Sequence, residues 1–224
     1  AADVFFVRNP SNEWIETTCT FRVDPKKRPS FWDPADGETH TALFFTPVEQ
    51  GVSVPLRLPA GGSIFVVFTP NAGETPAVTI AKDASLPLPG VMPGPDGASL
   101  EVWRNGLYEL SKAGDRPWAL HVDNIPESVV LEGPWTIHFP ANWGAPARAE
   151  FAALHSWTDD PEEGIKYFSG IATYDKRVQI DSSLLTENRR LYLDLGEVRD
   201  IARVRLNGKD LGILWKAPFR VEIT

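Results

Sequence analysis

Short apolar runs that alternate with polar residues recur along the chain, and clusters of Pro, Gly, Asn and Asp separate them. The run 202–206 is typical, because its apolar residues alternate with Arg203 and Arg205. Such alternation places one face of a strand in a core and the other face in water. No stretch beyond about ten residues keeps a helical period, so the pattern predicts an all-β protein.

The first 69 residues carry a series of predicted strands, bounded by turn residues such as Asn9-Pro10-Ser11. These strands span 4–8, 17–23, 43–46, 52–58 and 62–69. We expect them to form a small antiparallel β-sandwich over residues 1–69. Cys19 alternates with threonines in the second strand, and it is the only cysteine of the sequence. An intrachain disulfide is therefore excluded, and a buried core thiol is favoured.

Residues 70–99 interleave Pro with Gly, and we interpret them as a linker because this composition does not sustain a central ladder. Strand patterns resume beyond it. The pairs Asn105-Gly106 and Asn207-Gly208 lie between such strands, and each predicts a two-residue hairpin turn. We therefore expect a second β-sandwich domain over residues 100–224, which begins with a hairpin.

The charge balance narrows the classes of partner. Lys and Arg number 22 against 30 Asp and Glu, which gives a formal net charge of -8 and a pI near 5.0. An acidic chain repels phosphate backbones, so we expect no nucleic-acid partner. No run approaches the roughly 18 consecutive apolar residues that a membrane helix needs, so we expect no membrane partner either.

Two groups of residues in the second half resemble a known family. The later group is found at 190–196, 205–212 and 215–219, and it resembles the sugar-binding jelly roll of glycoside hydrolase family 2. The earlier group is found at 133–140, 156–158, 166–170 and Tyr174. With it, the chain resembles the C-terminal region of α-L-rhamnosidase-type proteins of glycoside hydrolase family 106. The match is good over 131–224, moderate over 1–69 and loose between them.

The resemblance implies a fold and a setting. It implies that residues 100–224 form a galactose-binding-like jelly roll and that the protein works on carbohydrate in a secreted or periplasmic location. In relatives a catalytic barrel precedes the part that resembles residues 1–69, so the resemblance implies a non-catalytic region. Relatives also continue beyond the position of Thr224 with another strand. We therefore expect an open strand edge near Thr224, through which copies of the chain form a homo-oligomer.

Sugar recognition needs flat aromatic faces for the C–H side of a pyranose and polar side chains for its hydroxyls. Trp143, Trp157 and Trp215 lie in loop-like segments, and Lys166 and Tyr167 share the segment of Trp157. We predict these five residues as the sugar-binding set. The alternative for each tryptophan is that its indole closes one end of a sandwich. No catalytic residue is predicted.

Acidic residues cluster at Asp159, Asp160, Glu162 and Glu163. Two carboxyls cleave a glycoside when they oppose each other across the sugar, and such pairs normally come from different strands. A solvated turn is therefore the first interpretation, and a structural calcium site at Asp159 and Asp160 is a weaker alternative. The histidines lack zinc-ligand spacing, so no other cofactor is expected.

These observations favour a non-catalytic module of a glycoside hydrolase that acts on plant polysaccharide or glycan, a module that binds carbohydrate or supports the catalytic part. A first alternative is a small glycoside hydrolase with acids drawn from Asp159, Glu163 and Asp194. A second is a structural β module that recruits another chain through the open edge near Thr224.

Overall fold

The computed structural model of the chain describes residues 1–35, 37–70, 78–94, 97–112, 115–186 and 188–224. Strands make up nearly all of the regular structure in this part, which confirms the predicted all-β class. No helix in it has the length and apolar character that crossing a membrane requires. Two compact units are present. Unit 1 consists of Ala1–Ile125 and Arg190–Thr224, and unit 2 consists of Pro126–Arg189.

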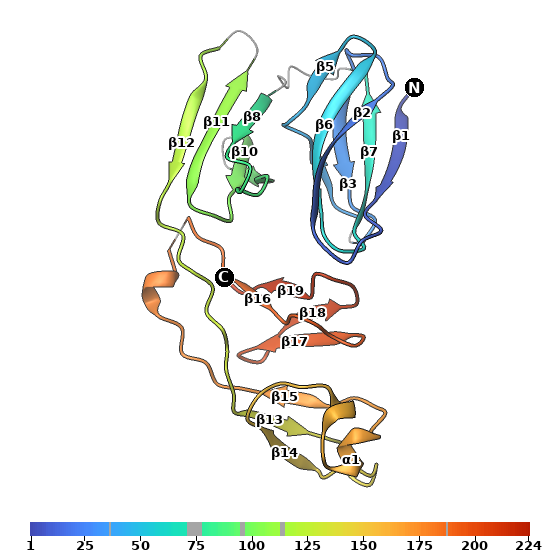
Figure 1. Cartoon of the computed structure of the whole chain (residues 1–224), viewed down its shortest axis with the longest axis vertical. Helices are drawn as coiled ribbons and strands as arrows, with labels where there is room; N and C mark the ends of the chain where they lie inside the picture. Colours follow the sequence, from blue (N-terminus) through green and yellow to red (C-terminus); the bar gives the residue numbers. More distant parts are fainter. Residues whose placement is uncertain (36, 71–77, 95–96, 113–114, 187) are drawn as a thin grey trace. The chain divides into compact units, whose positions relative to one another are not determined.

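The first part of unit 1 is a β-sandwich, drawn in blue and cyan in Figure 1. One sheet has the strand order β1-β7-β3-β4 and the other has the order β2-β6-β5. Their bounds are β1 Asp3–Arg8, β2 Ile15–Phe21, β3 Arg28–Trp32, β4 Thr39–Thr41, β5 Thr46–Val48, β6 Gly51–Leu58 and β7 Ser63–Thr69. Neighbouring strands are antiparallel throughout. The small antiparallel sandwich expected over residues 1–69 is therefore present.

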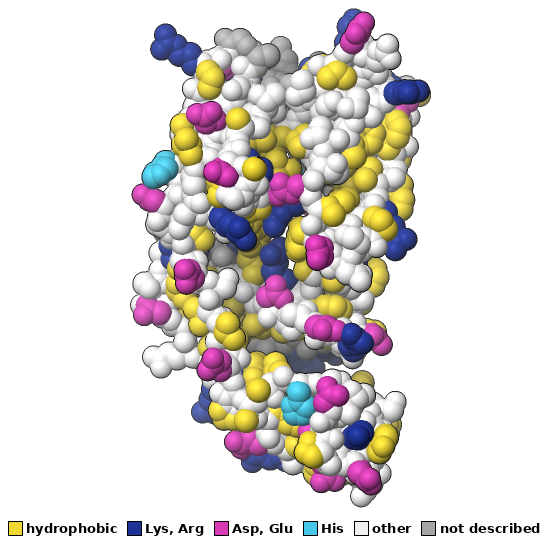
Figure 2. Space-filling view, viewed as in Figure 1, with side chains coloured by type: hydrophobic (Ala, Val, Ile, Leu, Met, Phe, Trp, Pro, Cys, Tyr) yellow, Lys and Arg dark blue, Asp and Glu magenta, His cyan; other side chains and the backbone are white. Residues whose placement is uncertain are grey.

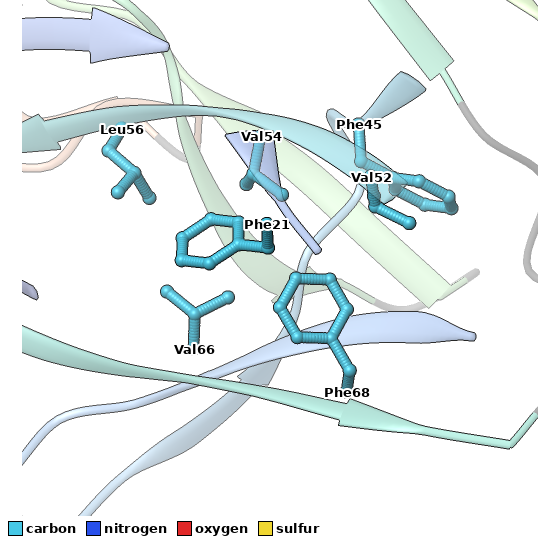
Figure 3. Close-up of a cluster of buried hydrophobic side chains, with 7 residues drawn as sticks. All are labelled: Phe21, Phe45, Val52, Val54, Leu56, Val66 and Phe68. Carbon is cyan, nitrogen blue, oxygen red and sulfur yellow. The ribbon is translucent and has the colours of Figure 1, made fainter. Parts of the chain in front are cut away.

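Aromatic rings fill the core of this sandwich (Figure 3). Along β6, burial alternates between core and surface, as the sequence pattern predicts. The Phe21 and Phe68 ring centres lie 5.2 Å apart, and the Phe5 ring meets Phe68 edge-on at 5.8 Å. Cys19 packs against this core with partial exposure, and burial raises the pKa of its thiol.

The sequence pattern misses β3 and β4. Pro29 lies within β3, and a proline ordinarily argues against a strand between two others because it cannot donate a ladder hydrogen bond. In the structure Pro29 is fully buried opposite Phe68, and β3 still pairs with both β7 and β4. β4 has only three residues, too few to show an alternation.

A second group of strands in unit 1 forms a three-stranded sheet of order β12-β11-β8 and a two-stranded sheet of β10 and β9. Their bounds are β8 Val78–Lys82, β9 Gly90–Gly94, β10 Gly97–Glu101, β11 Gly106–Lys112 and β12 Trp118–Val122. The interpretation of 70–99 as a linker differs from this arrangement, because β8 and β9 lie within it. Both are edge strands, where Pro and Gly are tolerated. Residues 71–77 and 95–96 of this range lie outside the described residues.

The hairpin predicted at Asn105-Gly106 is wrong. β10 pairs with β9 and β11 pairs with β8 and β12, so these two residues do not join paired strands. The Asn105 side chain instead donates to the carbonyl of Ile125 at 3.0 Å and accepts from its N–H at 2.8 Å. A Cβ at Gly106 would lie 2.5 Å from Leu86, so close packing explains this glycine.

The last strands of unit 1 form two antiparallel pairs, β16 with β19 and β17 with β18. Their bounds are β16 Tyr192–Asp194, β17 Ala202–Leu206, β18 Lys209–Leu214 and β19 Arg220–Glu222. Asn207 and Gly208 connect β17 to β18 with φ values of 50° and 83°. Positive φ at both central residues is what a tight type I′ turn requires, so this predicted hairpin is confirmed.

Unit 2 holds a three-stranded sheet of order β14-β13-β15 beside one short helix. Its elements are β13 Trp135–His138, β14 Arg148–Phe151, the 3-10 turn η1 Trp157–Asp159, α1 Glu163–Lys166, β15 Thr173–Asp175 and the 3-10 turn η2 Ser182–Leu184. Residues 126–189 thus form a unit of their own within the range expected to be one domain. The galactose-binding-like type of jelly roll and the open edge near Thr224 stay predictions.

Substitution of Phe68 tests the packing of the sandwich. Phe68→Ala should lower the free energy of unfolding by about 3–5 kcal/mol, because it leaves a cavity where a fully buried ring stood. Phe6→Ala is the matched control, since Phe6 is 57% exposed on the neighbouring sheet strand β1. Urea unfolding followed by tryptophan fluorescence measures both, and equal losses in the two variants would contradict the assigned core.

Candidate functional site

Trp143 occupies a tight loop of unit 2 and is 63% exposed. Its neighbours Asn142 and Gly144 have φ values of 65° and 94°, which turn the chain sharply at this point. A Cβ added to Gly164 would lie 2.3 Å from the carbonyl oxygen of Gly144, so helix α1 packs directly on the loop. A Cβ at Gly170 would lie 3.3 Å from the Trp143 ring, so one edge of the indole rests on backbone while the rest stays open.

Helix α1, which packs on this loop, ends at Lys166 and leads into Tyr167. Ile165 and Phe168 are buried in the core of unit 2 and anchor the helix. Tyr167 follows the helix and is 75% exposed, and the Lys166 ammonium lies 5.9 Å from the centre of its ring. A fixed backbone thus carries two exposed aromatic rings, Trp143 and Tyr167, with a cation next to one of them.

The Trp157 ring packs against the core of unit 2. Its ring packs edge-on against Phe139 at 5.8 Å and Phe168 at 5.5 Å, and its indole N–H donates to the Tyr174 hydroxyl at 2.6 Å. These contacts make Trp157 part of the wall of the core in unit 2. They are the alternative considered for a loop tryptophan, in which the indole closes the end of a sandwich.

The acidic loop of unit 2 is organised around a His155–Asp160 pair. His155 Nε2 lies 2.8 Å from Asp160 Oδ2, and its Nδ1 lies 3.0 Å from the Ala153 carbonyl. Both partners accept hydrogen bonds, so they favour the imidazolium, and the carbonyl of Ala153 followed by Asp160 raises the pKa of His155. Asp160 also accepts from the N–H of Glu162 at 2.9 Å, and this bond above all lowers its pKa.

The pairing of Asp160 with His155 is relevant to the metal-binding and catalytic roles considered for the acidic residues. The Asp160 side chain is 8% exposed and is engaged by His155 and by backbone. In the described part of the chain, no three His, Cys, Asp or Glu side chains are grouped so that they could hold a metal ion. Asp159 and Glu163 are exposed in unit 2, whereas Asp194 belongs to unit 1 and accepts from the N–H of Gly196 at 2.8 Å.

Trp215, the remaining predicted residue, lies in unit 1 after β18 and is 59% exposed. The Lys216 ammonium lies 5.8 Å from the centre of its ring and 3.9 Å from Asp33 Oδ1. Trp215 is therefore an exposed ring with a cation beside it, and it belongs to a different unit from Trp143 and Tyr167.

Unit 1 also contains a groove of about 530 Å³ between the outer face of β2 and β6 and the strand β8. Hydroxyl-bearing side chains line much of it, together with apolar residues of β8. Glu16 and Lys82 are both lining residues and form an ion pair of 3.2 Å. Its volume lies within the range of ordinary ligand pockets, roughly 300–1,000 Å³.

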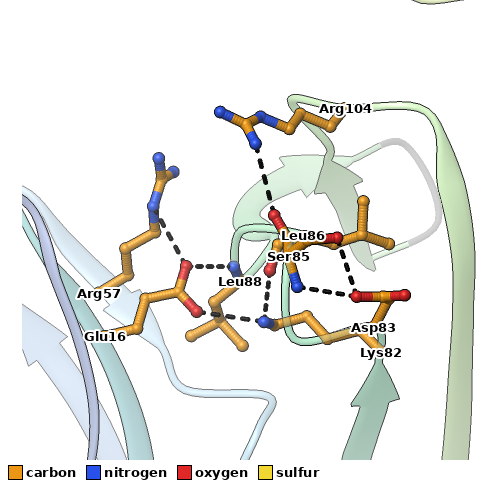
Figure 4. Close-up of polar contacts among 8 residues, drawn as sticks. All are labelled: Glu16, Arg57, Lys82, Asp83, Ser85, Leu86, Leu88 and Arg104. Carbon is orange, nitrogen blue, oxygen red and sulfur yellow. Dashed lines mark hydrogen bonds and ion pairs between the residues drawn. The ribbon is translucent and has the colours of Figure 1, made fainter.

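Glu16 is the centre of the polar contacts in this region (Figure 4). One carboxylate oxygen accepts from the N–H of Leu88 at 2.6 Å and lies 3.5 Å from Arg57 Nε, and the other lies 3.2 Å from Lys82. Lys82 also donates to the carbonyl of Leu86. The Arg57 guanidinium in turn stacks over the Trp14 ring at 4.3 Å.

Sequence reasoning missed this groove and its charges. Glu16 and Arg57 face each other only because β2 and β6 pair in one register, and Lys82 comes from β8, which lies in the range interpreted as a linker. The one available signal was a charged residue on or directly before a predicted strand, with Arg57 inside 52–58 and Glu16 just before 17–23. That signal does not identify the partner.

Comparison with known proteins connects the chain to larger glycosidases. No family model matches it. It is 46% identical over 119 residues to a protein from Formosa agariphila that is provisionally named beta-glucuronidase, and it spans 10% of that protein. A solved rhamnosidase from Novosphingobium sp. PP1Y matches 98% of the chain with a TM-score of 0.65 and 28% identity, and the match covers 17% of that enzyme. The chain is thus similar to a region of glycoside hydrolases, and it spans a small fraction of the length of both.

The His155–Asp160 pair predicts a pH dependence of stability. The raised pKa of His155 means that its contribution is fully present below the ordinary histidine value of about 6.5 and is lost as pH rises through the higher folded value. The lowered pKa of Asp160 means that its contribution is present above about 3.9 and is lost as pH falls through the lower folded value. Urea unfolding should therefore show the pair's contribution at its largest between about pH 4 and 6.5.

The comparison that tests this dependence is His155→Gln against His121→Gln, since His121 is exposed on β12. The first variant should flatten the decline in stability above about pH 6.5, and the second should retain it. An unchanged decline in His155→Gln would show that another group causes it.

Proposed function

We propose that this protein is a non-catalytic carbohydrate-binding module of a glycoside hydrolase, or a part that supports its catalytic domain. The likeness to a rhamnosidase over 98% of this chain and only 17% of that enzyme is the observation that carries the proposal. A region of this size within a larger glycosidase is suited to hold substrate or to support the catalytic part. The provisional name of the relative from Formosa agariphila adds the same carbohydrate context.

The proposed sugar contact is a face of unit 2 formed by Trp143 and Tyr167, because the helix that leads into Tyr167 packs on the loop of Trp143. Both rings are largely exposed although the backbone beneath them is fixed by the buried anchors Ile165 and Phe168. Fixed, exposed rings suit the C–H face of a pyranose because little side-chain freedom remains to be lost on binding. Lys166 lies beside Tyr167 and offers ammonium donors to sugar hydroxyls.

Aromatic substitution tests this assignment. Trp143→Ala and Tyr167→Ala should each weaken retention on soluble plant polysaccharides by about tenfold in affinity gel electrophoresis, because each removes one stacking surface. Trp118→Ala is the matched control, since Trp118 is 47% exposed on β12 in unit 1 and lies outside the proposed face. It should migrate as the unsubstituted protein does.

Circular dichroism should show the same fold for all three variants, because none of these rings is buried. Retention that is unchanged in Trp143→Ala and Tyr167→Ala would refute this face as the sugar contact. The same experiment with Trp157→Ala would be uninformative about binding, because that ring packs in the core of unit 2 and its removal changes stability.

A further inference from the structure

A second group of aromatic and basic side chains lies in unit 1 and takes no part in the proposed function. The Arg220 guanidinium on β19 lies 4.4 Å from the centre of the Trp103 ring and 5.0 Å from that of Tyr192. These two rings are 5.2 Å apart. The Tyr192 hydroxyl donates to Glu101 at 2.7 Å, which fixes its ring. Arg220 is thus positioned by two rings that come from distant parts of the sequence.

Two further arginines belong to the same region. Arg104 directly follows Trp103, whose ring contacts Arg220, and Figure 4 shows Arg57 and Arg104 on either side of the Glu16 and Lys82 contacts. Burial lowers the pKa of Arg57, Glu16 raises it, and the positive charges of Arg220 and Arg104 lower it again. Arg104 is exposed, and its guanidinium donates to the carbonyl of Ser85 at 3.4 Å (Figure 4). The positive charges of Arg104 and Arg220 thus both act on Arg57, on a protein whose net charge is -8.

The nearby carboxylates pair with Arg57, Lys82 and Tyr192 and not with Arg104 or Arg220. Glu16 is shared between Arg57 and Lys82, and Glu101 accepts from Tyr192. In the part of the chain that the structure describes, no carboxylate lies within ion-pair distance of Arg104 or Arg220. Figure 2 shows Lys and Arg side chains in a hollow of unit 1, with Asp and Glu side chains beside them. Two positive charges are thus available to an anion from outside.

The aromatic neighbours favour a particular kind of anion. Trp14 is 42% exposed and stacks on Arg57, and Trp103 stacks on Arg220 in the same way. A guanidinium that stacks by its face keeps its N–H groups in the ring plane, where they bind a carboxylate or a sulfate through two parallel hydrogen bonds. The partly exposed rings meanwhile offer surface to the apolar face of a pyranose. An anion that is part of a sugar satisfies both requirements.

We infer that Trp14, Arg57, Trp103, Arg104 and Arg220 form a binding site for an acidic saccharide, whose pyranose carries a carboxylate or a sulfate. This set is called the arginine–tryptophan site. The inference rests on the proposed carbohydrate role but concerns a different unit from Trp143 and Tyr167. It also specifies a charge on the ligand that the face of unit 2 does not require.

Isothermal titration calorimetry on the full chain tests this inference with three polymers of different charge. Polygalacturonate carries carboxylates, dextran sulfate carries sulfates, and dextran is the neutral control. We expect at least one acidic polymer to bind more tightly than dextran. We expect the double variant Arg104→Gln/Arg220→Gln to weaken that binding by about 10- to 100-fold, because two charge-assisted contacts are lost.

The matched control is Arg148→Gln/Arg205→Gln, which removes two exposed arginines elsewhere and changes the net charge equally. It should bind as the unsubstituted protein does. The single variant Arg104→Gln leaves the stacked Arg220 in place and should weaken binding several-fold, which keeps the test decisive if the double variant folds poorly. Binding by one acidic polymer and not the other identifies the anion.

Equal weakening in the control pair would overturn the site, since binding would then follow net charge alone. Binding of neither acidic polymer by the unsubstituted chain would overturn it as well. The outcome is separable from that of the proposed function, because Trp143→Ala should leave acidic-polymer binding unchanged. Loss of acidic binding in Trp143→Ala would place that ligand on unit 2 and contradict the inference.

Discussion

The carboxylate of Glu16 joins the sandwich of unit 1 to the strands beside it. It leaves the outer face of β2, holds Arg57 on the adjacent strand β6, and reaches Lys82 on β8 and the backbone of Leu88. The Glu16 side chain is about one-third exposed, so burial strengthens these contacts little. Their strength comes from the three donors that are positioned around one carboxylate. These donors hold β8 beside the groove, together with the backbone hydrogen bonds that join Val78 to Leu43 and Phe45.

In unit 2 a small apolar core, rather than a polar centre, fixes the residues on the surface. Phe168 packs against Phe139 and Trp157, and with Ile165 it holds the four-residue helix α1. So short a helix has no stability of its own, and packing supplies it. The exposed rings of Trp143 and Tyr167 are therefore a product of the buried ones. Each unit presents aromatic rings beside cations, which are arginines and Lys216 in unit 1 and the lysines Lys166 and Lys176 in unit 2.

The sequence was sufficient where local pattern determines structure. The alternation in β6 and the Asn207-Gly208 dipeptide predicted the correct elements. Burial requires apolar residues, and positive φ favours Asn and Gly, so both are visible in the residue types. The sequence failed at Asn105-Gly106, where the same dipeptide serves a distant backbone contact to Ile125. The packing of Trp157 against the core of unit 2 likewise depends on contacts that its loop-like context does not show. The contacts of Glu16 and of Arg220 depend on register and on strands far apart in the sequence. No local pattern reports such contacts, which is why the arginine–tryptophan site was not predicted.

The central claim is that fixed, exposed aromatic rings on this protein bind sugar, and the indole N–H resonances of its eight tryptophans test it most directly. A ¹H–¹⁵N titration with neutral and acidic oligosaccharides, after assignment by single substitutions, reports on each ring separately. We predict that the Trp143 resonance shifts with neutral sugar and that the Trp14 and Trp103 resonances shift with acidic sugar. The resonance of Trp157, whose indole N–H is bonded to Tyr174, should not shift. Indole resonances that remain unmoved by every saccharide at millimolar concentration would contradict it.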